Sequence, residues 1–202
     1  MKDTKTTILD VAEHLFAQNG FAGTSVRAIV EEAEVNIASI NYHFKSKEGL
    51  FLAVIQRRFR QIEKERFRKL ESHFEKTSGS PTVEGVVRAF LEPLQQSYDS
   101  NDQVPKILIR IFSETPDLKE KIIRPIFGKT RDKFFKAFCK AMPKLSEAEV
   151  QWRFQFLLSA MVGLIIFSEE TKNIIGLLPG NKSFIEMVIE QTLNGIGETA
   201  AK

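Results

Sequence analysis

Residues 37–44 are the part of this sequence best suited to bind a partner through hydrogen bonds and apolar contacts. Ile40 and Phe44 are spaced to lie on one buried side of a helix, which leaves the opposite side free. That side carries small or hydrogen-bonding groups, namely Ala38, Ser39, Asn41 and Tyr42, with His43 at the rim. Such groups suit contact with base edges in the major groove of DNA, whereas a merely solvated face would carry Lys and Glu.

The histidines and the single cysteine are not spaced as in the active site of an enzyme. The three histidines, His14, His43 and His73, are not spaced to share a metal ion with each other or with the single cysteine, Cys139. No glycine-rich phosphate loop, nucleophile elbow or His-Glu-x-x-His motif is present. We therefore predict no catalysis, no metal ion and no cofactor.

Three short helices are predicted to position the residues near the N-terminus. Apolar residues at 8–16 follow the helical spacing, and Gly20 can end that helix because glycine accepts left-handed backbone. Thr24 or Ser25 can cap a second helix. The third spans about 37–44, and a tight break before it is what a helix-turn-helix unit requires. The alternative is a three-helix cap without a DNA partner.

The charge balance gives little support for a nucleic-acid partner. The whole chain carries a formal net charge of +3, and acidic side chains outnumber basic ones in residues 1–50. The basic residues there are Lys2, Lys5, Arg27, Lys45 and Lys47, and the acidic ones are Asp3, Asp10, Glu13, Glu31, Glu32, Glu34 and Glu48. The prediction of DNA binding therefore depends on helix geometry.

A long helix is predicted from Lys47 to Lys76, with Ser46 as its N-cap. Its apolar stripe comprises Phe51, Val54, Ile55, Phe59, Ile62, Phe67, Leu70 and Phe74. Basic residues, including Arg57, Arg58 and Arg66, alternate with glutamates along the rest of the helix. This pattern is typical of a solvated face with ion pairs, which we favour over a second DNA site.

Helical patterns follow a loop at 77–81, and together they predict an all-α fold of about nine helices. The later patterns span about 82–98, 105–113, 117–141, 146–168 and 182–196. No strand pattern with a period of two residues occurs. We predict a helix-turn-helix DNA-binding head at 1–50, a connecting helix and loop at 51–80, and a helical effector-binding and dimerisation body at 81–202.

Phenylalanine supplies most of the aromatic residues, with 17 Phe against two Tyr and one Trp, so the aromatic surface is largely apolar. Pro93 and Pro125 lie inside helical patterns and should kink them, which leaves gaps that an apolar small molecule could fill. The candidates for the walls of this effector cavity are Phe90, Phe112, Phe134 and Phe138. The simpler alternative for each of them is a place in the core.

Two of the later helices are predicted to form a dimer interface. Small residues let helices approach closely, and apolar residues supply buried surface. The candidates are Trp152, Phe156, Ser159, Ala160 and Gly163 on the helix at 146–168, with Ile185, Val188, Ile189 and Thr192 on the helix at 182–196. A homodimer would also place two recognition helices on successive turns of one DNA duplex.

Two runs of residues closely resemble the DNA-binding domain of the tetracycline-repressor (TetR) family of transcriptional regulators. Residues 20–29 read Gly-Phe-Ala-Gly-Thr-Ser-Val-Arg-Ala-Ile, and residues 40–50 read Ile-Asn-Tyr-His-Phe-Lys-Ser-Lys-Glu-Gly-Leu. The similarity covers roughly the first quarter of the chain, with several motif positions in register. The remainder resembles the family in size and helical organisation only, so it does not indicate the ligand.

The resemblance implies contacts with the DNA backbone at the starts of two helices. Thr24 and Ser25 would meet phosphate at the start of the second helix. Arg27 would reach a base edge or a phosphate, although it could instead pair with Glu31 on the helix surface. Lys47, at the start of the long helix, resembles the phosphate-contacting lysine of the family.

The resemblance also implies that the third helix is the recognition helix. Ile37, Ala38 and Ser39 would read bases, with thymine methyl groups suited to the first two. Tyr42 and His43 resemble the aromatic residues of the family that contact the DNA backbone, although His43 could instead be a packing histidine.

Two positions depart from the pattern of the family. Many members carry Tyr where this chain has Asn41, and Asn can bond N6 and N7 of adenine together, which suggests base readout. The turn position at Glu34 is usually Gly in the family. A side chain at positive φ there would cost on the order of 1 kcal/mol, so we expect a strained or differently shaped turn.

The combined prediction is a sequence-specific DNA-binding transcriptional regulator, namely a repressor that an apolar small molecule releases from its operator. Its partners would be palindromic double-stranded DNA, a second copy of the chain and that effector. The alternative is a dimeric helical adaptor or ligand-binding protein without specific DNA binding.

The chain is expected in the cytoplasm, without a membrane partner. Residues 1–5 are not followed by an unbroken apolar segment, which argues against a signal peptide. The longest apolar run, at 157–167, is too short to span a bilayer. A single cysteine also excludes an internal disulfide, which fits a reducing compartment.

Overall fold

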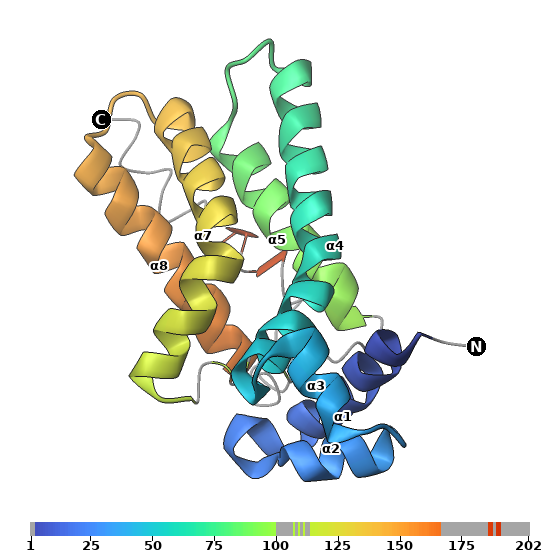
Figure 1. Ribbon diagram of the computed structural model, residues 1–202. Helices are drawn as coiled ribbons and strands as arrows, with labels where there is room; N and C mark the ends of the chain where they lie inside the picture. The colour runs from blue at the N-terminus through green and yellow to red at the C-terminus, as the bar shows by residue number, and fades with distance from the viewer. Residues whose placement is uncertain are drawn as a thin grey trace. The chain divides into compact units, whose positions relative to one another are not determined.

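The computed structural model describes residues 3–99, 107, 109, 111, 114–166, 186, 187, 189 and 190. These residues form seven α-helices and no strand, which confirms the predicted all-α fold (Figure 1). The helices are α1 (Thr4–Gly23), α2 (Val26–Glu32), α3 (Ile37–Phe44), α4 (Lys47–Lys76), α5 (Val83–Asp99), α7 (Pro116–Ala141) and α8 (Glu147–Ile166). The helices predicted at 105–113 and 182–196 lie largely outside the described residues.

The backbone packs into two compact units. Residues 1–61 and 101–127 make up the first unit, and residues 62–100 and 128–202 make up the second. Helix α4 therefore begins in the first unit and ends in the second. The functional boundaries predicted from the sequence stay predictions, because backbone packing does not by itself define a function. None of the helices in the described residues is long and apolar enough to cross a membrane.

An apolar core lies beneath the short helices of the first unit. Its buried members include Ile8, Ala12, Phe16, Ile29, Ile40, Phe44, Leu50, Phe51 and Val54. The rings of Phe16 and Phe51 meet edge to face with their centroids 4.8 Å apart, and the Phe21 ring lies 5.2 Å from that of Phe51. Helices as short as α2 and α3 are not stable alone in water, so this packing is what maintains them.

Gly20 interrupts α1, as its residue type predicts. Its φ of 71° lies in the left-handed region, which glycine adopts at little cost. The hydroxyl of the buried Thr24 donates to the carbonyl oxygens of Gly20 at 2.8 Å and Leu15 at 3.1 Å. Ser25 rather than Thr24 therefore caps α2, and its hydroxyl accepts a hydrogen bond from the Ala28 amide at 3.0 Å.

The second unit packs the later part of α4 with α5, α7 and α8 around a second core (Figure 1). Its buried members are Leu70, Val86, Val87, Ala89, Phe90, Leu91, Phe134, Ala137, Phe138, Met142, Val150, Phe154, Leu157 and Ile189. Two ion pairs join the helices at the rim of this core. Lys69 on α4 contacts Glu92 on α5 at 2.8 Å, and Lys133 on α7 contacts Glu71 on α4 at 2.7 Å.

The prediction that the basic residues of α4 form a solvated face is wrong for three arginines, which contact other parts of the chain. Arg57 donates to Asp10 at 2.7 Å and to Glu13 at 2.6 Å, and both acceptors lie on α1. Arg58 also bonds Glu13. Arg66 is only 5% exposed. Because α1 covers one part of α4 and α5 covers another, basic side chains of α4 also meet protein.

Candidate nucleic-acid interface

Helices α2 and α3 form the predicted helix-turn-helix unit. Four residues separate them, and the Val35 amide reaches back to the Val30 carbonyl at 3.1 Å. Asn36 caps α3, since its side-chain oxygen accepts a hydrogen bond from the Ala38 amide at 2.8 Å. These local bonds fix where α3 begins relative to α2.

Helix α3 has one buried side and one open side. Ile40 and Phe44 are buried in the core of the first unit. The other side presents Ile37, Ala38, Ser39, Asn41, Tyr42 and His43, of which Ser39 and His43 are half-buried and the rest exposed. Tyr42 is 76% exposed and meets the His43 ring edge to face at 4.9 Å. A large aromatic side chain this exposed indicates a surface that meets a partner.

The turn before α3 is strained at the predicted position. Glu34 adopts a φ of 53°, in the left-handed region that disfavours residues with a Cβ atom. Its amide donates to the Glu31 carbonyl at 3.3 Å, so the turn retains a hydrogen bond despite the strain. Of the two expected outcomes, a strained or a differently shaped turn, the left-handed φ of Glu34 shows the strained one.

Replacing Glu34 with glycine is expected to raise the free energy of unfolding by about 1 kcal/mol, because glycine removes the cost of the left-handed conformation. Urea unfolding followed by circular dichroism measures the change. The control is Glu34→Ala, which removes the same charge but keeps a Cβ atom and should bring no such gain. Equal stability of the glycine and alanine variants would show that the turn is not strained.

The start of α2 places two of its three predicted contacts at the surface. Ser25 is exposed, and the Arg27 side chain is 86% exposed while its Nε donates to Glu31 at 2.8 Å. The predicted phosphate contact of the Thr24 side chain is not supported, since that side chain is 2% exposed and its hydroxyl is bonded inside the chain. Without DNA, Arg27 forms a surface ion pair with Glu31, and its contact with DNA stays a prediction.

The junction between α3 and α4 is tight. Lys45 ends α3 with a φ of 70°, and the Ser46 hydroxyl then accepts from the Gly49 amide at 3.0 Å, which confirms Ser46 as an N-cap. A Cβ atom on Gly49 would overlap the Phe44 carbonyl oxygen and lie 3.2 Å from its carbon. Only glycine therefore fits at this position without displacing the end of α3.

Lys47 and Glu48 carry charge at the start of α4. The Lys47 ammonium lies over the Phe21 ring, 4.3 Å from its centroid, which limits the positions that this side chain adopts. A backbone hydrogen bond at Glu48, and then one from Ser46, lower the pKa of the Glu48 carboxyl. The carboxylate is thus favoured at this helix N-terminus, where partial positive charge accumulates.

Ion pairs neutralise part of the acidic charge of the first unit. Glu13 is 4% exposed, and its carboxylate is bonded by Arg57 and Arg58 from α4. Asp10 is bonded by Arg57 as well. The excess of acidic residues counted in residues 1–50 therefore overstates the negative charge that this unit presents to solvent.

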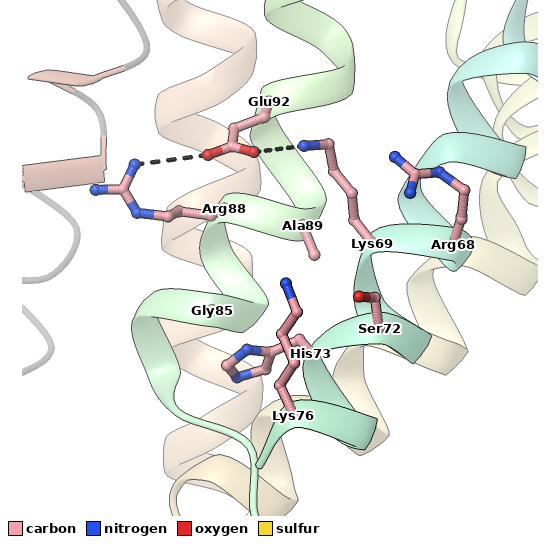
Figure 2. Close-up of a pocket in the computed structure, with 9 residues that line it drawn as sticks. All are labelled: Arg68, Lys69, Ser72, His73, Lys76, Gly85, Arg88, Ala89 and Glu92. Atoms are coloured by element: carbon pink, nitrogen blue, oxygen red, sulfur yellow. Dashed lines mark hydrogen bonds and ion pairs between the residues drawn. The ribbon is translucent and has the colours of Figure 1, made fainter.

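A groove of about 320 Å³ lies between α4 and α5 (Figure 2). Its lining is mostly basic and polar: Arg68, Lys69, Ser72, His73, Lys76, Gly85, Arg88, Ala89 and Glu92. Glu92 lies between two of these cations, with Lys69 at 2.8 Å and Arg88 at 3.5 Å. This groove differs in character from the apolar effector cavity that the sequence predicts.

Three of the four phenylalanines predicted to line an effector cavity lie together in the core of the second unit. Phe90, Phe134 and Phe138 are each 3% exposed or less. Phe90 meets Phe134 edge to face at 5.0 Å, and Phe138 lies 5.3 Å from Phe154. These three side chains therefore belong to the core cluster of the second unit. Phe112 lies outside the described residues, and the effector site stays a prediction.

Helix α8 carries an exposed apolar stripe beside its buried one. Trp152 is 72% exposed and Phe156 is 61% exposed. Ser159 is exposed and Ala160 and Gly163 are half-buried on the same helix. The prediction that Ile189 lies in a dimer interface is corrected here. This side chain is 2% exposed and belongs to the core of its own chain. The predicted positions Ile185, Val188 and Thr192 lie outside the described residues.

The described residues offer little that would serve a metal ion or a nucleophile. Among them, no group of three or more His, Cys, Asp or Glu side chains is placed to hold a metal ion. Burial raises the pKa of the Cys139 thiol, which keeps it protonated and weakly nucleophilic at neutral pH.

The comparison with protein families identifies the class to which this fold and interface belong. The family of bacterial regulatory proteins named tetR matches residues 8–54, and the tetracyclin repressor-like C-terminal domain matches residues 84–193. The second match alone covers more than half of the chain. The chain therefore belongs to the TetR family, which confirms the resemblance predicted from its N-terminal motifs.

Two relatives show how far the sequence similarity extends. YttP of Bacillus subtilis, named a probable HTH-type transcriptional regulator, is 34% identical over 131 residues, which are 59% of this chain and 60% of YttP. QacR of Staphylococcus aureus is 43% identical over 51 residues, which are 25% of this chain and 27% of QacR. The chain thus matches less than two thirds of the length of either relative.

Solved structures of regulators share the fold along nearly the whole chain. HlyIIR, a hemolysin II transcriptional regulator, has a TM-score of 0.60 at 21% identity, over 93% of this chain and 96% of its own. FadR of Bacillus halodurans, a fatty acid degradation regulator, has a TM-score of 0.66 at 12% identity, over 98% of both chains. At identities this low, the similarity establishes the fold alone.

Proposed function

We propose that this chain is a sequence-specific DNA-binding regulator of transcription that reads duplex DNA with α3. The observation that carries the proposal is the open side of α3, where Asn41 and the 76% exposed Tyr42 stand beside small side chains. Small and hydrogen-bonding groups let a helix approach base edges closely. Membership of the TetR family supports the same function.

Base readout in this proposal comes from the first half of α3 and from Asn41. Ile37, which is 54% exposed, and Ala38 suit the methyl groups of thymine, while Ser39 offers a donor and an acceptor. Asn41 can bond adenine in a bidentate manner. These four residues would determine which sequence is preferred.

In this proposal, the residues that contact the DNA backbone surround the four residues that contact bases. Tyr42 and His43 would meet phosphate from α3, and Ser25 and Arg27 would do so from the start of α2. Lys47 would supply a cation from the start of α4. Arg27 would have to exchange its surface pair with Glu31 for DNA, which costs little because exposed ion pairs are weak.

The working form in this proposal is a homodimer joined through α8. Trp152 and Phe156 leave an apolar stripe in solvent, and covering it with the same stripe of a second copy would bury both. Gly163 has open space around the position of a Cβ atom, so another helix can approach there. One recognition helix reads few base pairs, whereas two related by a two-fold axis read a palindrome.

We further propose that the regulator is a repressor and that an effector bound in the second unit releases it. Effector and DNA would bind different conformations of the dimer, so each would weaken the other by the same factor. A dimer seated on an operator at a promoter would exclude the transcription machinery until the effector binds.

Transcription in vitro from a promoter overlapping the preferred duplex tests the repressor function. Transcripts should fall as the purified dimer is added, and they should not fall on a matched template whose duplex is scrambled. Increased transcription would identify an activator instead. Unchanged transcription on both templates, without preference for either duplex, would favour the helical adaptor.

A further inference from the structure

The groove between α4 and α5 lies within the second unit and gathers positive charge (Figure 2). Four of its nine lining side chains are cationic, namely Arg68, Lys69, Lys76 and Arg88, against the single carboxylate of Glu92. Its volume of about 320 Å³ is in the range of small-molecule sites. A cleft lined by charges of one sign focuses their electric field, so this groove attracts anions more strongly than a flat surface would.

Small residues on α5 keep the groove open. Gly85 and Ala89 lie four residues apart on the side of α5 that lines it. A Cβ atom at Gly85 would overlap the ring of His73. That ring is held in place, since its Nε2 accepts a hydrogen bond from the Thr82 amide at 3.0 Å. A larger side chain at position 85 or 89 would therefore project into the space between the two helices.

Part of the positive charge in the groove is paired within the protein. Lys69 contacts Glu92 at 2.8 Å and thereby ties α4 to α5. Arg88 lies 3.5 Å from the same carboxylate and contacts Glu84, one turn earlier on α5, at 2.8 Å. These three ion pairs account for Lys69 and Arg88, and they leave the groove-lining cations of α4 at positions 68 and 76 to be explained.

Polar groups of α4 remain available in the groove. Lys76 forms no ion pair, and the Ser72 hydroxyl no hydrogen bond, with any described part of the chain. In Figure 2 the Lys76 side chain extends back along α4 toward Ala89. The Arg68 side chain is 63% exposed and pairs with Glu65 through its Nε at 2.8 Å, so its terminal N–H groups can also meet a ligand.

These groups are not needed to hold α4 against α5, because the ion pair of Lys69 and Glu92 already does so. Arg68, Ser72 and Lys76 are spaced four residues apart, so they follow one another along the same side of α4. Cations gathered around one hollow repel each other, and an anion inside the hollow would offset that repulsion. The arrangement therefore favours a negatively charged ligand.

We propose that this groove binds the phosphate group of a small phosphorylated molecule. Phosphate oxygens accept hydrogen bonds from a guanidinium, an ammonium and a hydroxyl, which Arg68, Lys76 and Ser72 supply. A phosphate ester carries a charge of about −1.5 to −2 at pH 7, so it matches several cations better than a carboxylate does. This site adds a second kind of ligand to the apolar effector, and it does not depend on the proposed reading of DNA by α3.

Calorimetric titration of pyrophosphate into the full chain at constant ionic strength tests the proposal. Pyrophosphate offers phosphate groups without an apolar body, so its binding does not report on an apolar effector site. Lys76→Gln should weaken the binding about tenfold, because it removes the unpaired cation of the groove. Lys64→Gln is the matched control and should bind as the wild type does, since Lys64 is exposed on the same helix outside the groove.

Other results would overturn the proposal. No binding of pyrophosphate to the wild type would do so, and so would an equal loss in Lys64→Gln, which would indicate a general attraction to surface charge. Arg68→Gln should also weaken binding, and it takes the place of Lys76→Gln if that variant does not fold. Unchanged affinity in the groove variants would refute the site.

A DNA duplex of random sequence separates a small phosphorylated ligand from the DNA backbone. Its affinity should be the same for the wild type and for Lys76→Gln. If Lys76→Gln weakens binding of the duplex as much as binding of pyrophosphate, the groove contacts nucleic acid and the proposal of a small ligand fails.

Discussion

The double variant Asn41→Ala/Tyr42→Ala is expected to fold normally and to lose about two orders of magnitude or more of affinity for its preferred duplex. Both side chains are exposed on α3, so their removal leaves the core residues Ile40 and Phe44 in place. A bidentate contact to a base contributes about 1–3 kcal/mol of discrimination, and the tyrosine adds a contact to the backbone. Fluorescence anisotropy at fixed salt concentration measures the loss.

The single variants separate the two roles. Asn41→Ala should relax the choice of base at one position, whereas Tyr42→Ala should weaken binding to preferred and scrambled duplexes alike. Gln56→Ala, at an exposed position of α4 in the same unit, is the control and should bind as the wild type does. Wild-type affinity in the double variant would mean that α3 does not read DNA.

Charging the exposed stripe of α8 is expected to convert the dimer into a monomer. In Trp152→Glu/Phe156→Glu, two large apolar side chains that are 72% and 61% exposed in one chain become carboxylates. A two-fold axis would bring these charges toward the same charges of the second copy, where burial without a partner is costly. Sedimentation velocity should then give the mass of one 23.0 kDa chain.

DNA affinity should fall with the dimer, by about a hundredfold or more, because a monomer reads one half-site. Trp152→Phe/Phe156→Leu keeps the stripe apolar and serves as the control, which should remain dimeric. A charged variant that is still a dimer would place the interface elsewhere on the chain, and the proposal for α8 would fail.

Local signals in the sequence predicted the helices of the first unit well. Gly20 and Ser46 are recognisable because each acts within a few residues, by conformational freedom and by capping. The open side of α3 followed from the spacing of Ile40 and Phe44. These two residues lie on one side of the helix, so the residues on the other side are left exposed. The resemblance to the family indicated a strained or differently shaped turn at Glu34, and its φ of 53° shows the strained form.

Contacts between distant residues were not predictable in the same way. Arg66 lies four residues from both Ile62 and Leu70, on the same side of α4, but its charge favoured an exposed position, and spacing did not show that it would bond the Phe90 carbonyl of α5. The inward hydroxyl of Thr24 and the burial of Ile189 likewise depend on neighbours far along the chain or on a kink. Burial of a side chain is a property of packing, and periodicity reports only which face of one helix it occupies.

Selection from a pool of random duplexes by the purified protein is the measurement that tests the central claim most directly. The account predicts enrichment of a two-fold symmetric site with half-sites about 34–36 Å apart, bound well above scrambled DNA across a salt series. No enriched site, with only weak binding that disappears at moderate salt, would contradict the proposal that α3 reads DNA sequence.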